Sequence, residues 1–252
     1  MVNARGIGQP PPERIDPLEE PPGIVAHHLA KYAVASAMLG PGTIADIGCG
    51  LGYGTASLDR EDRSIFGVDV DEETIRTATS RYSTRRLAFA LMDGQVLAFR
   101  KESLDGVVCF EALEHLRDPH RHIAEVARVL KSAGTYIVST PRAGTGGSPD
   151  INPHHHHEFD REGLERLLLT FFDDVSLMGQ TRRRTGLHAL AVRLDVLGLR
   201  RGRLMQPTLR RIATFLGGRA TEDALPEDFS IGPDLGESSE LVAVCRAPRK
   251  QT

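Results

Sequence analysis

Two glutamates and one histidine follow a predicted strand at a spacing that suits metal or acid–base chemistry. The strand covers Leu104–Phe110, and after it come Glu111, Glu114 and His115. Positions i, i+3 and i+4 share one face of a helical turn, so the three side chains can converge. Carboxylate and imidazole groups together are ligands for a divalent cation. Without a cation, the neighbouring carboxylates would repel and raise each other's pKa.

A run of four histidines, His154–His157, lies beyond the next predicted strand and is followed by Glu158. Each imidazole can bind a cation or act as a general base, and Glu158 can orient such a base. The run leads into a patterned helix, so we interpret it as native sequence. For His154 and His156 we favour positions on a solvated loop.

An acidic, glycine-rich segment predicts a ligand-binding turn. Residues 44–54 read IADIGCGLGYG, a short apolar strand with Asp46 near its end and then glycine at every second position. The glycines expected to contact a ligand are Gly48, Gly50 and Gly52. Glycine permits positive φ and close approach of a ligand to the main chain. The spacing is neither G-x-G-x-x-G nor a P-loop. The carboxylate would repel pyrophosphate and suits a cationic ligand.

Two more acids follow the next predicted strands. Asp69 lies 19 residues beyond Gly50, and its carboxylate can accept hydrogen bonds from a ribose diol. Asp93 follows the third strand, and the intervals from Asp46 to Asp69 and from Asp69 to Asp93 are 23 and 24 residues. We include their neighbours Val70 and Met92 in the predicted ligand site. Asp71 is expected to cap a helix that starts at Glu72.

Short apolar runs alternate with helix-like stretches, which predicts an α/β fold with a doubly wound, mostly parallel sheet. The predicted strands are Thr43–Ile47, Ser64–Val68, Leu87–Leu91, Leu104–Phe110, Gly134–Ser139, Phe172–Leu177 and Glu240–Cys245. The predicted helices are Ile24–Leu39, Tyr53–Leu58, Glu72–Tyr82 and Pro119–Leu130. Ligands gather at the carboxyl ends of such strands, where all the acids above lie.

The chain divides into four predicted parts. Residues 1–23 form a Pro- and Gly-rich arm, 24–180 a core, 181–238 a helical cap beside the site, and 239–252 the last strand and tail. Residues 182–219 contain ten arginines and one acid, whereas residues 220–240 contain seven acids and no Lys or Arg. Any one of these arginines is best explained as part of a solvated helical surface. The cluster as a whole, in contrast, could favour an anionic substrate.

The composition fits one globular enzyme domain. The chain has 252 residues, 40% hydrophobic and 26% charged, with a net charge of -3. This balance gives no general preference for nucleic acid or anionic membranes. No apolar run is long enough to span a bilayer, and the start of the chain lacks a signal-peptide core. Three scattered cysteines predict reduced core thiols and a cytoplasmic location. A homo-oligomer remains open.

Residues 44–54 resemble motif I of the class I S-adenosylmethionine (SAM)-dependent methyltransferases. The resemblance implies a Rossmann-like, seven-stranded sheet and SAM as cofactor. It assigns the ribose to Asp69 and the adenine amino group to Asp93, and it places Asp46, the loop glycines and Glu111 around the rest of the cofactor. It covers about residues 24–180 and the last strand, and it specifies no substrate.

A narrower resemblance follows from E-x-x-E-H with a distal histidine. This pattern resembles the metal-dependent methyltransferases of small-RNA terminal ribose, and its first part resembles ubiquinone-biosynthesis O-methyltransferases. Residues 151–168 and 241–246 also resemble actinobacterial methyltransferases associated with glycan synthesis. The resemblance implies that Mg²⁺ or Mn²⁺ is held by Glu111, Glu114, His115 and His155. It places the distal histidine ligand within the run 154–157 to within one residue.

We expect SAM-dependent O-methylation of a sugar, glycan or other diol, with metal assistance. Glu114, His115 and His155 are the predicted catalytic residues, either histidine being a candidate general base. Three alternatives stay open: methylation of an RNA terminal ribose, metal-free methylation of a small molecule, and SAM binding without catalysis. Glu-His pairs after the fourth strand also occur in methyltransferases that bind no metal. The chain shows no recognisable RNA-binding module.

Overall fold

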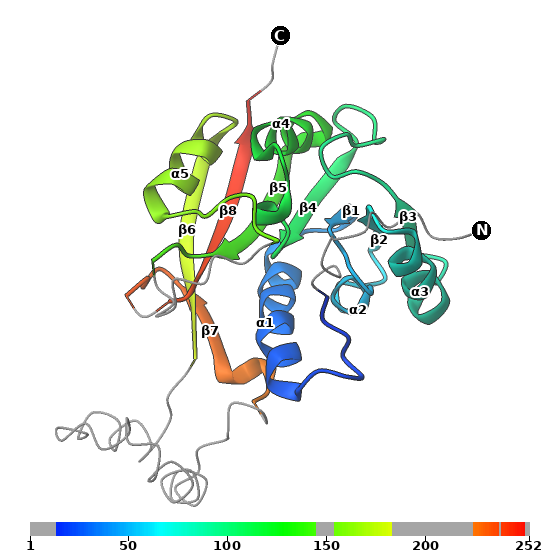
Figure 1. Cartoon of the computed structure of the whole chain (residues 1–252). Helices are drawn as coiled ribbons and strands as arrows, with labels where there is room; N and C mark the ends of the chain where they lie inside the picture. Colours follow the sequence, from blue (N-terminus) through cyan, green and yellow to red (C-terminus); the bar gives the residue numbers. More distant parts are fainter. Residues whose placement is uncertain (1–13, 145–153, 183–223, 237, 250–252) are drawn as a thin grey trace, which may run out of the picture.

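The computed structural model describes residues 14–144, 154–182, 224–236 and 238–249 (Figure 1). Its centre is an eight-stranded sheet with the order β3-β2-β1-β4-β5-β8-β6-β7. The strands are β1 Gly42–Ile47, β2 Arg63–Asp69, β3 Leu87–Leu91, β4 Leu104–Phe110, β5 Leu130–Pro141, β6 Phe172–Arg182, β7 Phe229–Gly232 and β8 Glu240–Pro248. The predicted strands are all present, and β7 is additional.

The first five strands pair in parallel, and the last three pair antiparallel. β1 is hydrogen-bonded to both β2 and β4, so the strand order reverses beside β1. β8 runs antiparallel to β5 and β6, and β7 runs antiparallel to β6. The mostly parallel α/β fold is therefore confirmed, but the seven-stranded count is wrong. In such sheets a crevice for ligands opens at the carboxyl ends of the strands where the order reverses.

Within the described residues, five α-helices connect or cover these strands: α1 Pro22–Met38, α2 Tyr53–Ala56, α3 Glu72–Tyr82, α4 Pro119–Val129 and α5 Arg161–Leu169. Helix α3 begins as expected, because the Asp71 carboxylate accepts a hydrogen bond from the Thr74 amide at 2.8 Å. Helix α1 begins at Pro22, so the predicted arm ends slightly earlier than residue 23. The described end of the arm pairs with α3 through Asp16 and Arg81.

The described residues of the predicted helical cap form an added edge of the sheet, and the cap itself stays a prediction. Residues 224–236 form a 3-10 turn, η4 (Pro226–Asp228), and strand β7, which pairs with the end of β6. Most of the predicted cap, residues 183–223, lies outside the described residues, as do residues 1–13 of the arm. Four residues are too short for a period-two pattern, which explains why β7 was missed.

The core consists of two hydrophobic layers, one on each face of the sheet. Strand β4 contributes alternate side chains to both: Val107 and Cys109 lie in one layer, and Val108 and Phe110 lie in the other. This burial on both faces explains why the strands read as continuous apolar runs. Cys49, Cys109 and Cys245 are buried free thiols.

The buried guanidinium of Arg63 closes the carboxyl end of α1. It donates to the carbonyl oxygens of Ser36 at 2.8 Å, Gly40 at 3.1 Å and Leu58 at 3.2 Å. The last carbonyls of a helix have no partner within the helix, and burial makes their satisfaction necessary. Arg63 therefore fixes α1 against the sheet.

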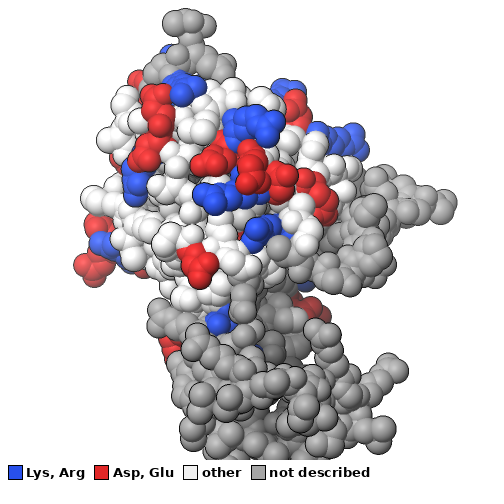
Figure 2. Space-filling model, turned by 90° about the vertical axis from the view of Figure 1, so that its left-hand side faces the viewer, with Lys and Arg blue, Asp and Glu red and all other residues white. Residues whose placement is uncertain are grey.

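Charges on the described surface are mixed. The face in Figure 2 carries Lys and Arg side chains interspersed with Asp and Glu side chains. Within the described part of the chain, no helix combines the length and apolar character needed to cross a bilayer.

Candidate functional site

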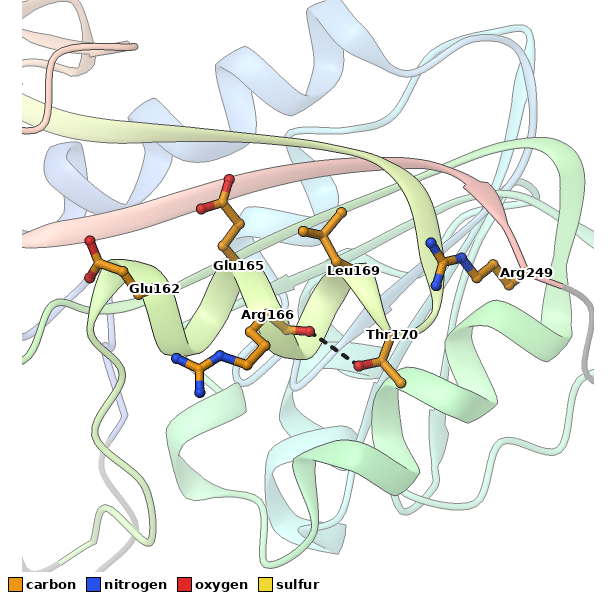
Figure 3. A pocket seen from close by; sticks show the side chains of 6 residues that line it. All are labelled: Glu162, Glu165, Arg166, Leu169, Thr170 and Arg249. Atoms are coloured by element: carbon orange, nitrogen blue, oxygen red, sulfur yellow. Dashed lines mark hydrogen bonds between the residues drawn. The ribbon is translucent and has the colours of Figure 1, made fainter.

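A surface depression of about 520 Å³ lies away from the predicted site (Figure 3). It is lined by Glu162, Glu165, Arg166, Leu169, Thr170 and Arg249. Arg249 follows the end of β8, and β8 is antiparallel to β5, so this depression lies toward the amino ends of the parallel strands. The acids singled out by the sequence lie at the opposite edge.

The glycine loop forms the tight turn that the sequence predicts. Gly48, Gly50 and Gly52 have φ values of 74°, 52° and 82°. A Cβ on Gly48 would lie 2.6 Å from the Cβ of Ala112, and one on Gly52 would lie 2.8 Å from the Phe89 ring. A Cβ on Gly50 would meet no atom within 4 Å. The loop is thus packed at both ends and open at its centre, which leaves the Gly50 backbone accessible to a ligand.

Asp46 is fully buried behind this loop. The hydroxyl groups of Tyr32 and Thr55 donate to its Oδ2 atom at 3.1 and 2.6 Å. Its Oδ1 atom is buried and has no hydrogen-bond partner among the described residues. Burial raises the pKa of Asp46 to about 7, although the hydrogen bonds from Thr55 and Tyr32 oppose the shift. A buried carboxylate oxygen without a partner fits a donor such as an ammonium group.

Asp69 connects the tip of β2 to the loop. Its carboxylate accepts hydrogen bonds from the amides of Gly50 at 3.1 Å and Asp71 at 3.0 Å. Asp69 is paired with Leu91 across β2 and β3. The side chains of Val70 and Leu91 are 74% and 55% exposed, an arrangement that suits the packing of a flat apolar ring.

Asp93 lies just beyond β3, in the turn that follows Met92. Its Oδ1 atom accepts hydrogen bonds from the backbone amide and side-chain amide of Gln95, at 2.8 and 3.2 Å. The Met92 amide donates to the Asp69 carbonyl at 2.9 Å, so the ends of β2 and β3 are held together. The structure thus brings Asp46, Asp69 and Asp93 to one edge of the sheet, each at a strand end.

Glu111 adopts a backbone conformation that is uncommon for a residue with a side chain. Its φ is 49°, at the end of β4. Its carboxylate accepts a hydrogen bond from the Ser139 hydroxyl at 2.5 Å and lies 3.1 Å from the Lys31 ammonium. Lys31 is 1% exposed and also pairs with Glu240. Burial raises the pKa of Glu111, but the Lys31 charge and the hydrogen bonds from Ser139 and Lys31 together outweigh burial, so the pKa lies below its ordinary value.

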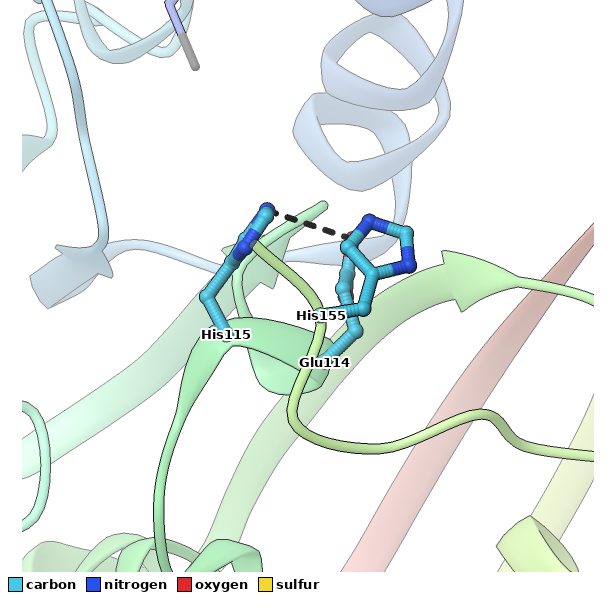
Figure 4. A group of neighbouring side chains, drawn as sticks. All are labelled: Glu114, His115 and His155. Atoms are coloured by element: carbon cyan, nitrogen blue, oxygen red, sulfur yellow. Dashed lines mark ion pairs between the residues drawn. The ribbon is translucent and has the colours of Figure 1, made fainter. Parts of the chain in front are cut away.

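Glu114, His115 and His155 come together beside this edge (Figure 4). One ligand atom of each lies within 4.8 Å of the others. The 3-10 turn η1 (Leu113–His115) brings the first two together, and the third comes from the histidine run. The amides of His156 and His157 donate to the Glu114 carbonyl at 2.8 and 3.2 Å, which docks the run onto η1.

The orientations within this group suit a cation or a proton acceptor. The His115 Nδ1 atom donates to the His154 carbonyl at 3.0 Å, which directs Nε2 toward Glu114, 3.9 Å away. Such a backbone partner fixes the tautomer of a metal-binding imidazole. Glu114 is 2% exposed, and the Thr140 hydroxyl donates to it at 3.0 Å. Burial and the charge of Glu111 raise the pKa of Glu114 to about 8.

Three of the four predicted metal ligands are therefore brought together, and Glu111 is not among them. Its carboxylate is engaged by Lys31 and Ser139 instead. No motif in the sequence marks Lys31, Tyr32 or Glu240 as residues of the site. One sequence signal could have pointed to Lys31, because it is a charged residue between Ala30 and Tyr32 in the first helix. In the structure all three residues are buried.

Comparisons with known proteins agree with this architecture. The family model described as "Methyltransferase domain" matches residues 45–138. A probable S-adenosylmethionine-dependent methyltransferase of Mycobacterium tuberculosis is 36% identical over 140 residues, covering 54% of this chain and 50% of the relative. The ubiquinone biosynthesis O-methyltransferase of Coxiella burnetii is 30% identical over 99 residues, covering 38% of this chain and 42% of the relative. The chain spans about half the length, or less, of these relatives.

Solved structures share the fold. A SAM-dependent methyltransferase of Thermotoga maritima, described as a possible histamine N-methyltransferase, superposes with a TM-score of 0.62 at 17% identity, over 89% of this chain and 92% of that one. The family match begins at the strand that carries Asp46 and ends in β5, so it contains the glycine loop, Asp69, Asp93 and Glu111. Residues 45–138 therefore match a methyltransferase domain, and they lie in a Rossmann-like α/β fold.

Proposed function

We propose that the protein is an O-methyltransferase that moves the methyl group of SAM to a hydroxyl of a sugar, glycan or other diol-bearing molecule, with the help of a divalent cation. The observation that carries the proposal is the group of Glu114, His115 and His155, whose ligand atoms lie within 4.8 Å of one another at the cofactor edge of the sheet. The Coxiella relative is named an O-methyltransferase, which supports an oxygen acceptor.

The cofactor residues have separate tasks in this proposal. SAM supplies an electrophilic methyl group when it is bound. The unpartnered Oδ1 atom of Asp46 accepts from the amino group, and Asp69 accepts from the ribose diol. Asp93 accepts from the adenine amine, and Val70 packs against the ring. The open centre of the loop at Gly50 lets the backbone contact the ligand.

The proposed metal ligands are one carboxylate and two imidazoles. A divalent cation at this position supplies Lewis-acid polarisation that lowers the pKa of an acceptor hydroxyl. Carboxylate ligands suit Mg²⁺ and Mn²⁺, and the two imidazoles favour Mn²⁺ over Mg²⁺. Glu114 would supply the negative charge among the three ligands. The hydrogen bond from His115 Nδ1 to the His154 carbonyl keeps the Nε2 atom of His115 facing the site.

Metal-free catalysis is the second candidate, because Glu158 is placed to orient His155 as a general base. The His155 Nδ1 atom lies 2.9 Å from Glu158. A carboxylate in that position orients an imidazole and stabilises its protonated form, as general-base catalysis requires. In this version His155 removes the proton of the acceptor hydroxyl as the methyl group is transferred.

Two further alternatives depend on other features. A terminal ribose of RNA carries the same vicinal diol, and its recognition would rest on the arginines of residues 182–219, nearly all outside the described residues. Steep salt dependence of RNA binding would support that substrate. If the protein binds SAM but forms no S-adenosylhomocysteine when any cell extract is supplied as the source of methyl acceptors, this would support a non-catalytic role.

The test separates cofactor binding from methyl transfer. In Glu114→Gln and His115→Ala, we expect methyl transfer from labelled SAM to a cell extract to fall at least about 100-fold. The dissociation constant for SAM, measured by calorimetry, should stay within about threefold of wild type. His120→Ala, which removes an exposed histidine on α4, is the matched control. Loss of SAM binding in the first two variants would place these residues in the cofactor pocket and overturn the proposal.

A further inference from the structure

We propose that Gln180, Glu240 and His27 form a second polar subsite, which binds a hydroxyl of the acceptor other than the one that is methylated. The ligand it fits is a neutral polyhydroxylated ring. The inference rests on the proposed function in one respect: the acceptor is taken to be a sugar or another polyol. We call this group the Gln180 subsite.

The Gln180 subsite lies at the same edge of the sheet as the cofactor residues. Glu240 begins β8 and is paired with Pro141 at the carboxyl end of β5 and with Gln180 near the end of β6. Helix α1 lies beside β7 at this edge (Figure 1). His27 belongs to this helix. Lys31, one turn further along α1, pairs with both Glu240 and Glu111. One ammonium group therefore separates the subsite from the end of β4.

Gln180 contains a buried acceptor with no partner. The side chain is 2% exposed, and its Nε2 atom donates to the His27 carbonyl at 2.7 Å. Its Oε1 atom has no hydrogen-bond partner among the described residues. Buried polar atoms nearly always have partners, so each exception needs an explanation. Asp46 shows the same feature at this edge, where the cofactor provides the donor in our proposal.

Acceptors outnumber donors around Gln180. The Oε1 atom of Glu240 lies 3.3 Å from the Nδ1 atom of His27. Burial and the charge of Lys31 lower the pKa of His27 to about 4, so the ring is neutral and offers one N–H. The Lys31 ammonium already lies between the two nearby carboxylates. A neutral donor therefore fits better than a second cation, and a hydroxyl group is such a donor.

An aromatic wall completes the subsite. Phe229 on β7 packs edge to face against His27, with ring centroids 4.9 Å apart. Both side chains are only half-buried, so their faces can contact the C–H surface of a ring. Strand β7, which the sequence analysis missed, thus supplies the apolar side of the proposed subsite.

Saturation-transfer NMR on the full chain loaded with S-adenosylhomocysteine tests the inference. The probes are methyl glucoside and myo-inositol as polyols and ethanolamine as an amine. We expect saturation transfer to a polyol with wild type and a dissociation constant about tenfold higher with Gln180→Met, as loss of one hydrogen bond predicts. Thr181→Val, on the same strand, should bind as wild type does. S-Adenosylhomocysteine should bind equally to all three.

Three results would overturn the inference: no polyol binding to the loaded wild type, equal binding by Gln180→Met, or preferred binding of ethanolamine. If Gln180→Met does not fold, Glu240→Gln replaces it, with the same expected weakening and the same contrary result. Failure of wild type to bind S-adenosylhomocysteine would instead contradict the proposed function. The two failures are therefore distinguishable within one sample.

Discussion

The hydroxyl of Tyr32 donates to the Asp46 carboxylate across 3.1 Å, and this bond ties helix α1 to the residue behind the glycine loop. Tyr32 is also packed against the loop, because a Cβ on Gly54 would lie 2.2 Å from its ring. The first helix is therefore part of the cofactor site as well as of the core. Its position determines which oxygen of Asp46 remains available to a ligand.

The binding of SAM should depend on the charge of Asp46. Its pKa is about 7 in the cofactor-free protein, well above the ordinary 3.8, and the ionised form is needed to pair with an amino group. We expect affinity for SAM to rise about tenfold between pH 5.5 and pH 7.0, as measured by calorimetry. For Asp46→Asn the affinity should be low and nearly constant over this range. A flat wild-type profile would contradict the assignment of Asp46.

The same shift affects stability in the opposite direction. A carboxyl group whose pKa is raised in the folded state stabilises that state when protonated. Its contribution is complete below pH 3.8 and is lost as the pH rises through about 7. Bound SAM should remove this loss, because it pairs with the ionised form. The check is to compare the thermal unfolding temperature at pH 5.5 and at pH 7.0, with and without SAM.

Two glycines of the loop should respond differently to substitution by alanine. A Cβ on Gly54 would clash with the Tyr32 ring, so Gly54→Ala should lower the free energy of unfolding by about 1–3 kcal/mol. A Cβ on Gly50 meets no protein atom, and its positive φ costs only about 1 kcal/mol. Gly50→Ala should therefore fold but bind SAM at least about tenfold more weakly. Chemical denaturation and calorimetry measure the two effects. Normal SAM binding by folded Gly50→Ala would contradict the proposed approach of the ligand.

The guanidinium of Arg63 should be essential to the position of α1. Arg63→Met removes the donors to the carbonyl oxygens of Ser36 in α1, of Gly40 just after this helix and of Leu58 beyond α2. We expect a loss of about 3 kcal/mol in the free energy of unfolding, measured by chemical denaturation. Arg60→Met, on the exposed surface next to Asp62, should change it by less than about 0.5 kcal/mol. Similar values for both variants would contradict the capping role of Arg63.

The sequence predicts the parallel strands and the antiparallel strands β6 and β8, but it does not mark the edge strand β7. Apolar runs mark β1 to β5. Strand β4 and the later parts of β1 and β5 are buried on both faces, whereas the edge strand β3 is partly exposed. Strand β7 has four half-buried residues, and its pairing with β6 follows a long intervening segment. The acids of the glycine loop, β2 and β3 were found because each follows a recognisable strand.

The partner of Glu111 could not be found in the same way. Spacing places Glu111 near Glu114, but it carries no information on Lys31, which comes from a different helix. Lys31 also pairs with Glu240, 209 residues away in sequence. Only the folded topology brings these three charges together, and it removes Glu111 from the predicted ligand set.

The central claim is that a divalent cation at Glu114, His115 and His155 assists methyl transfer. The most direct measurement is transfer from labelled SAM to a cell extract after treatment with a chelator, followed by addition of Mn²⁺ or Mg²⁺. The account predicts loss of transfer to a hydroxyl-bearing product on chelation and its recovery on addition of the cation, in wild type but not in Glu114→Gln. Transfer that continues undiminished in the chelator, with SAM still bound, would contradict it.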